Sequence, residues 1–221
     1  MTAAEPKTVG KTKQRKYSNS VDNVTLRRTL MAKQAKTLTQ QELRRALDYV
    51  ATRRHAARNR AMLLAMYYAG LRVSECAALR YENVLDSEGK IVGEIRLSAE
   101  QTKGRHSRVV FVSEKLRKEL QAYVRQTPYK HVTDKLFYTQ KKGGDGFTAN
   151  TLCQYFHYLF KQCGIEGASS HSPRRTFITN LAEKGVSVRV LQSLAGHRNI
   201  STTQVYIDVN DAMKRKAVEL V

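Results

Sequence analysis

A chain of 221 residues, 41% of them hydrophobic, can bury a core, which excludes a wholly disordered protein. No apolar stretch approaches the roughly 18 residues of a membrane span, and the charged N-terminus lacks the apolar segment of a secretory signal. The net charge of +20 favours a polyanionic partner, because each neutralised phosphate releases counterions; a basic surface that only confers solubility is the alternative. Cys76, Cys153 and Cys163 form no CxxC pair, so we expect reduced thiols rather than zinc ligands.

The N-terminal segment is strongly basic. Residues 1–36 hold nine lysines and arginines against two acidic residues, with little apolar periodicity. We expect them to form a basic, largely flexible arm, with at most a short ordered piece near 24–31. The folded domain is expected to span 37–221. Its first helix is predicted by a capping box of Thr39 and Glu42, with Leu38 and Leu43 in the positions of a hydrophobic staple.

The remaining elements are predicted from periodicity and from turn residues. Helices are expected from Thr39 to about 50, at 57–69 with Gly70 as the stop, and through SECAALR. The alternating segments VGEIRLS and SRVVFVS flank AEQTKGRH and predict a small antiparallel hairpin. Further helices are expected at 114–126 and 148–163, separated by the turn KKGGDG, and then at 173–184, 187–194, 202–208 and 210–219. The predicted fold is mainly α with one small antiparallel β-sheet (α+β).

The common catalytic motifs are absent from the sequence. It contains no HExxH, GxSxG, P-loop or GxGxxG pattern. Its acidic residues are too few and too scattered to suggest the clustered carboxylates of a two-metal nuclease. If the chain cleaves a phosphodiester, arginines must therefore stabilise the phosphate, and protein side chains must supply the nucleophile and the acid.

The segment HSPRRTF predicts an anion site at a helix start. Ser172 is expected to be the N-cap and Pro173 the first helical residue. Arg174 then lies in the first turn, where free backbone N–H groups already favour an anion, although a cation there opposes the helix dipole. His171 precedes the cap. A phosphate clamp accounts for this pattern, and a surface arginine beside a loop histidine is the structural alternative.

The segment GHRNISTTQVY predicts a second capped helix start. Ser201 and Gln204 match a capping box, and Ile200 and Val205 occupy the staple positions. Tyr206 would then fall in the second turn, while His197 belongs to the turn before the helix. A phenol has a free pKa of about 10, so a nucleophilic tyrosine needs cationic surroundings. Taken by itself, this segment favours a tyrosine that packs against its neighbours over a nucleophilic one.

Two more basic residues are candidates whose ordinary interpretations are structural. Arg72 follows the predicted stop at Gly70, with Glu75 three residues later, so a helix cap or an ion pair accounts for it. Lys103 is predicted at the tip of the hairpin, where a solvated turn lysine is the simpler interpretation.

Taken together, these segments resemble the tyrosine recombinase (phage integrase) family over roughly residues 38–210. Their order and approximate spacing are similar to those of that family: Arg72 in GLRVSE, Lys103 in TKGRHSR, H-x-x-R, and G-H-x-x-I-x-T-T-x-x-Y ending at Tyr206. The small size resembles the short fimbrial-type invertases. The resemblance implies the integrase catalytic-domain fold without a complete N-terminal core-binding domain. Pro173 and Arg175 depart from the family, which commonly has leucine and histidine there.

The resemblance also implies roles for individual residues. Tyr206 would attack the scissile phosphate, leaving a 3′-phosphotyrosyl bond and a free 5′-hydroxyl. Arg72 and Arg174 would clamp the pentacoordinate phosphorane. Neither a metal nor another cofactor is implied, because the phosphotyrosine conserves the bond energy.

Four further residues receive supporting roles by the same resemblance. Lys103 would protonate the departing 5′-oxygen. His171 would act as general base or acid toward the tyrosine proton, and His197 would donate a hydrogen bond to the phosphate. Glu75 matches the acidic position that orients neighbouring catalytic groups.

The implied function is site-specific recombination of double-stranded DNA by integration, excision or inversion. The implied assembly is a homotetramer on synapsed DNA sites, with an accessory DNA-bending protein as a further partner. The implied location is cytoplasmic, at the nucleoid, without a membrane. A type IB topoisomerase and a non-catalytic DNA-binding regulator on the same fold are the alternatives.

Overall fold

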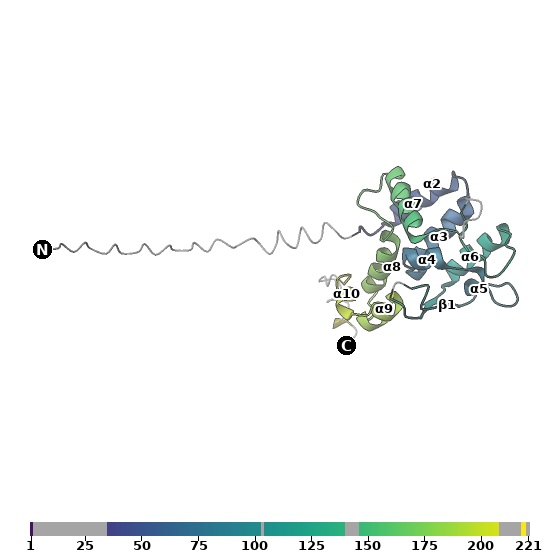
Figure 1. Ribbon diagram of the computed structural model, residues 1–221. Helices are drawn as coiled ribbons and strands as arrows, with labels where there is room; N and C mark the ends of the chain where they lie inside the picture. The colour runs from purple at the N-terminus through teal and green to yellow at the C-terminus, as the bar shows by residue number, and fades with distance from the viewer. Residues whose placement is uncertain (2–34, 103, 140–145, 208–217, 220–221) are drawn as a thin grey trace. The chain divides into compact units, whose positions relative to one another are not determined.

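The computed structural model describes residues 1, 35–102, 104–139, 146–207 and 218–219 (Figure 1). The chain divides into two units, Met1–Gln34 and Ala35–Val221, and the fold below is that of the second. Several sequence predictions lie outside the described residues: the flexible arm with its piece near 24–31, Lys103, most of the KKGGDG turn, and most of the helix at 210–219. Within the described part, no helix is long and apolar enough to cross a membrane.

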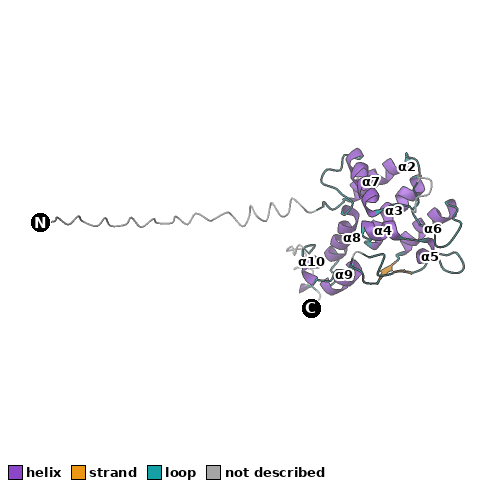
Figure 2. Cartoon of the chain, in the orientation of Figure 1, coloured by secondary structure: helices purple, strands orange, loops and turns teal. Residues whose placement is uncertain are grey.

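The second unit is mainly helical (Figure 2), and its described residues include one two-stranded sheet, as predicted. Its first half contains α2 (Gln40–Ala51), α3 (Ala56–Ala69), α4 (Val73–Ala78), α5 (Tyr81–Val84), β1 (Glu94–Leu97) and β2 (Arg108–Phe111). Its second half contains α6 (Glu114–Gln126), α7 (Ala149–Gln162), α8 (Ser172–Glu183), α9 (Val188–Ala195) and α10 (Ile200–Gln204). The four-residue α5 was not predicted, because a single turn is too short to show a helical period.

Helix α2 begins as its capping box predicts. The Glu42 backbone N–H donates to Thr39 Oγ1 at 3.2 Å, and Glu42 Oε2 accepts from the Thr39 backbone N–H at 2.9 Å. Leu38 and Leu43, the staple positions, are both buried. The helix start is therefore held by local groups.

Helix α3 is the central helix of this unit. It is buried on nearly every side and packs against α2, α6 and α8, which is why its residues show no apolar stripe. It ends at Gly70, whose φ of 60° is left-handed and whose hypothetical Cβ would lie 2.4 Å from the Phe177 ring on α8. Glycine is required there both by the backbone and by the close approach of α8.

The sheet confirms the predicted hairpin in a shorter form. Strands β1 and β2 are antiparallel, with Leu97 opposite Arg108. Ile95 and Leu97 are buried while Glu94 and Arg96 are exposed, which is the alternation of a strand with one face on the core. Strand β2 also contacts α9, so the sheet brings Arg108 next to the C-terminal third of the chain.

Helix α8 begins one residue earlier than predicted. His171 is its N-cap residue and has α-helical backbone angles, so Ser172 is the first helical residue. The Ser172 hydroxyl accepts from the backbone N–H of Ser169 at 2.9 Å. Predicting Ser172 as the N-cap was therefore wrong, because the preceding loop uses its side chain.

The prediction for α10 was wrong at both ends. Asn199 caps the helix by accepting from the Ser201 backbone N–H at 3.2 Å, so Ser201 is not the cap; asparagine is an equally good cap and comes first in the chain. The helix ends at Gln204, which leaves Tyr206 in the following turn. Val205 is 49% exposed and forms no staple.

Candidate active site

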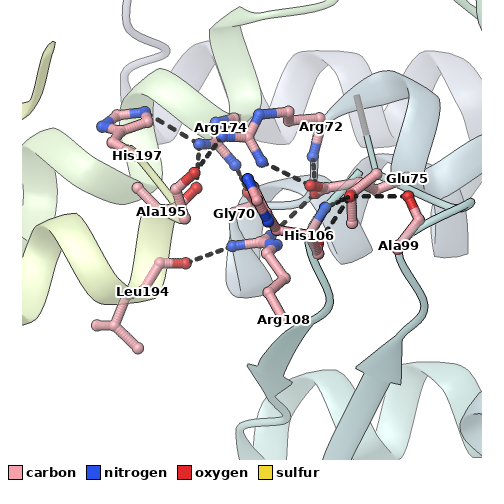
Figure 3. Close-up of polar contacts among 12 residues, drawn as sticks. Gly70, Arg72, Glu75, Ala99, His106, Arg108, Arg174, Leu194, Ala195 and His197 are labelled. Carbon is pink, nitrogen blue, oxygen red and sulfur yellow. Dashed lines mark hydrogen bonds and ion pairs between the residues drawn. The ribbon is translucent and has the colours of Figure 1, made fainter. Parts of the chain in front are cut away.

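The C-terminal end of α9 gathers three arginine side chains (Figure 3). Three consecutive carbonyl oxygens accept from them: Leu194 from Arg108 Nη1 at 2.7 Å, Ala195 from Arg174 Nη2, and Gly196 from Arg72 Nη2 at 2.6 Å. The last carbonyls of a helix lack intrahelical partners and carry the negative end of its dipole. They therefore suit guanidinium donors and hold three cations side by side.

A buried carboxylate links two of these arginines. Glu75 is 0% exposed; its Oε1 accepts from Arg72 Nη1 at 2.6 Å and its Oε2 from Arg108 Nη2 at 2.9 Å. Burial alone would raise the pKa of Glu75, but the charges of Arg108 and Arg72 and the hydrogen bonds from Arg72 outweigh it and lower the pKa. Glu75 is therefore ionised, and one negative charge stands against three positive ones.

Arg174 is the most enclosed cation of the group. It is 6% exposed, lies in the first turn of α8, and donates to the carbonyl oxygens of Gly70 and Ala195. Burial, followed by repulsion from Arg72, lowers the pKa of Arg174 to about 9, so it stays charged at neutral pH. A cation at a helix N-terminus and beside like charges is poorly compensated, and a bound anion would correct that imbalance.

His197 packs directly against Arg174. Its Nε2 lies 3.1 Å from Arg174 Nη2 and its Nδ1 lies 3.0 Å from Thr203 Oγ1. Because a guanidinium only donates, Nε2 accepts and the proton resides on Nδ1. Burial and the charges of Arg174, Arg72 and Arg108 lower the pKa of His197 to about 4. The imidazole is therefore neutral at pH 7, with its N–H directed at Thr203.

Tyr206 lies beside this cationic group. Its ring stacks on that of His197, with centroids 5.9 Å apart and planes 21° apart, and Arg175 Cζ lies 5.3 Å from the Tyr206 centroid. The fully buried Thr203 anchors α10 through its contact with His197. The cationic surroundings that a nucleophilic tyrosine needs are present.

One predicted site residue lies at the margin of this group, and another is outside the described residues. His171 is exposed at the start of α8, three positions before Arg174, and its backbone N–H donates to Ser169 Oγ at 3.2 Å. Lys103 is outside the described residues, although its neighbours Thr102 and Gly104 line the same cavity as Arg72 and His197. That cavity has a volume of about 510 Å³.

Three side chains at this site were not assigned from the sequence: His106, Arg108 and Arg198, all of which line the cavity. Arg108 could have been found, because strand alternation places it on the same face as the buried Val110. Among the described residues, the buried Arg108 Nε has no hydrogen-bond partner. His106 and Arg198 lie in turns and have no comparable signal.

The comparisons with known proteins agree with this arrangement. The model of the Phage integrase family matches residues 36–213. The tyrosine recombinase XerA of Thermococcus kodakarensis is 33% identical over 188 residues, which are 83% of this chain and 62% of that protein. The chain thus spans less than two thirds of the length of this curated relative.

Solved structures share the fold. The crystal structure of XerA recombinase has a TM-score of 0.65 and 26% identity, covering 83% of this chain and 64% of that one. The Tn1549 transposon integrase in complex with transposon right end DNA has a TM-score of 0.63 and 22% identity, covering 84% of this chain and 65% of that one. Because the family model spans most of the sequence, the chain belongs to the phage integrase family of tyrosine recombinases.

Proposed function

We propose that the protein is a site-specific DNA recombinase that cuts and rejoins double-stranded DNA through a 3′-phosphotyrosyl intermediate. The observation that carries the proposal is the position of Tyr206, stacked on His197, which in turn contacts the buried Arg174. Family membership supports the same conclusion. A tyrosine beside arginines held on helix carbonyls is suited to attack on a phosphate diester, since the cations stabilise the charge that develops.

In the proposed reaction, Arg72 and Arg174 bind the non-bridging oxygens of the scissile phosphate. Tyr206 Oη attacks phosphorus while His171 accepts the phenolic proton, and the bond to the 5′-oxygen breaks as Lys103 protonates that oxygen. Attack by a free 5′-hydroxyl on the phosphotyrosine reverses these steps and reseals a strand. Glu75 is fully buried and bonded to Arg72, so it acts as a positioning residue for Arg72.

The role of His197 needs a rearrangement in this scheme. Its Nε2 accepts from Arg174 and carries no proton, so it can donate to a phosphate only after Arg174 turns its N–H toward the anion and Nε2 gains a proton. A bound phosphate favours both changes, because an anion stabilises a nearby imidazolium. We therefore expect His197 to become a donor when DNA binds.

We propose that residues 37–221 form the catalytic domain and that the basic segment 1–36 binds DNA phosphates. A homotetramer on two synapsed sites and an accessory DNA-bending protein complete the proposed assembly. A protein with this substrate is expected at the nucleoid.

The experiment that tests the function is covalent trapping on suicide DNA. A pool of nicked duplexes of randomised sequence is incubated with the protein, and complexes that survive detergent are recovered and sequenced. A nick beside the scissile phosphate lets the short 5′-hydroxyl fragment escape, so the phosphotyrosine accumulates. We expect wild type to give covalent complexes on a recurrent sequence and Tyr206→Phe to give none.

Two results would contradict the proposal. Binding without any covalent complex would indicate a non-catalytic regulator. Covalent complexes on unrelated sequences, together with relaxation of supercoiled plasmids, would indicate a topoisomerase. Tyr206→Phe serves as the control, because it removes one hydroxyl and leaves the ring that stacks on His197.

A further inference from the structure

Arg198 bridges the two turns that face each other across the active-site cavity. Its Nη2 donates to the carbonyl oxygen of Gly104 at 2.6 Å and also contacts His106 Nε2. These partners precede it by 94 and 92 positions. The guanidinium lies directly over Gly104, since a Cβ built on that glycine would be 3.5 Å from Arg198 Nε.

The bridge is anchored at the Arg198 end. Gln192 Nε2 lies within hydrogen-bond distance of two carbonyl oxygens, that of His197 at 3.1 Å and that of Arg198 at 3.2 Å. These contacts tie the backbone of the turn to α9, which also holds the three arginines of the site. Because the backbone at Arg198 is already fixed, only its side chain must lose conformational freedom to hold the other turn.

The bridge is also anchored at the hairpin end, where Thr102 closes the turn. Its hydroxyl lies 2.8 Å from the His106 carbonyl oxygen and 3.2 Å from that of Ala99, and it accepts from the His106 backbone N–H. Thr102 is 8% exposed. The turn from Thr102 to His106 is thus closed on itself and fastened to Arg198.

We infer that Arg198 is a positioning residue: by fastening Gly104 and His106 to the α9–α10 turn, it supports proton transfer to the leaving 5′-oxygen. The inference rests on the proposed function, in which Lys103 is the general acid. Lys103 is the next residue before Gly104 in the chain, so loss of the Arg198 contact on Gly104 is expected to impair the general acid. Displacing a catalytic group by about 1 Å can cost about 100-fold in rate.

A substrate with a different leaving group distinguishes a role in positioning the general acid from a role in DNA binding. In ordinary DNA the 5′-oxygen leaves as the Tyr206 Oη–P bond forms, and it must take a proton from the general acid. When sulfur replaces that bridging 5′-oxygen, the P–S bond breaks and the thiolate departs without a proton, because its basicity is low. A variant whose only defect is a misplaced general acid therefore recovers on the sulfur substrate.

The test compares single-turnover cleavage of the trapped sequence in its 5′-oxygen and 5′-bridging-sulfur forms, at saturating protein. We expect Arg198→Ala to cleave the oxygen substrate roughly 10- to 100-fold more slowly than wild type. On the sulfur substrate it should come within about threefold of wild type. Lys103→Ala should show the same selective loss. Arg198→Lys, which keeps one donor for Gly104, should lose less.

The control is Arg117→Ala on α6, which removes the same charge from an exposed arginine paired with Glu114 and should match wild type on both substrates. Equal losses for Arg198→Ala on the two substrates would assign Arg198 to DNA binding and overturn the inference. So would unchanged cleavage of the oxygen substrate, or a Lys103→Ala defect that sulfur does not relieve. No covalent complex of wild type on either substrate would overturn the proposed function and the inference with it.

Discussion

Arg72 donates through Nη2 to the carbonyl oxygen of Gly196 at 2.6 Å, across a separation of 124 positions in the chain. Gly196 has a φ of 61° and caps α9 in the left-handed conformation. A glycine that ends one helix thus also accepts from the arginine at the start of α4. The geometry of the site therefore depends on how helix α9 ends.

Replacing Gly196 by alanine should destabilise the protein more than the backbone angle alone explains. The new Cβ would lie 2.8 Å from Arg108 Cδ, and Arg108 is held by Leu194 and Glu75. Gly185→Ala is the matched control, because Gly185 has a φ of 83° with no atom within 4 Å of its hypothetical Cβ. In urea unfolding we expect losses of about 1 kcal/mol for Gly185→Ala and about 2–4 kcal/mol for Gly196→Ala. Equal losses would contradict the predicted clash.

Removing the charge of Glu75 should be among the most destabilising single changes. Glu75→Gln leaves Arg72 and Arg108 without their carboxylate in a buried place, at an expected cost of about 3–5 kcal/mol in the free energy of unfolding. Glu88→Gln is the control, because Glu88 pairs with Lys90 at the surface, where a pair contributes about 0–1 kcal/mol. Chemical denaturation measures both, and a small effect of Glu75→Gln would mean that helix carbonyls alone hold the arginines.

The lowered pKa of His197 predicts a loss of stability on acidification. Its folded-state pKa is about 4 against about 6.5 when unfolded. Between these values the unfolded chain binds a proton that the folded chain does not, so the free energy of unfolding falls as pH decreases from 6.5 to 4. We expect His197 to contribute about 1–2 kcal/mol of this fall, after allowance for partial exposure. Denaturation of His197→Gln across this range should give a flatter curve, whereas His157→Gln, at an exposed position of α7, should keep the wild-type slope.

The net charge of +20 predicts DNA affinity that depends steeply on salt. If six or more phosphates are neutralised, the affinity should fall by roughly 10³-fold or more between about 50 and 200 mM salt. Fluorescence anisotropy of a labelled duplex with Tyr206→Phe measures binding without cleavage. A flat response would show that the charge is not used to bind phosphates.

The sequence alone identified the structural features that depend on residues close together in the chain. The capping box at Thr39, the stop at Gly70, and the hairpin follow from side chains within a few positions, where backbone preferences and local hydrogen bonds decide the conformation. The sequence was less decisive where two neighbouring residues could both serve as the cap of a helix. Both Asn199 and Ser201 can cap α10, and the structure uses Asn199, which shifts the helix and leaves Tyr206 beyond its end.

Only the tertiary structure decided how the candidate site is arranged. The meeting of Arg72, Arg108 and Arg174 at the end of α9 joins segments that are 124, 86 and 21 positions apart. The same packing sets the tautomer of His197 through Arg174 and brings Arg198 to Gly104. These contacts arise from the burial of α3 against α8 and of β2 against α9. Residue spacing along the chain does not by itself fix the geometry of such packing, because that geometry depends on every side chain in the core.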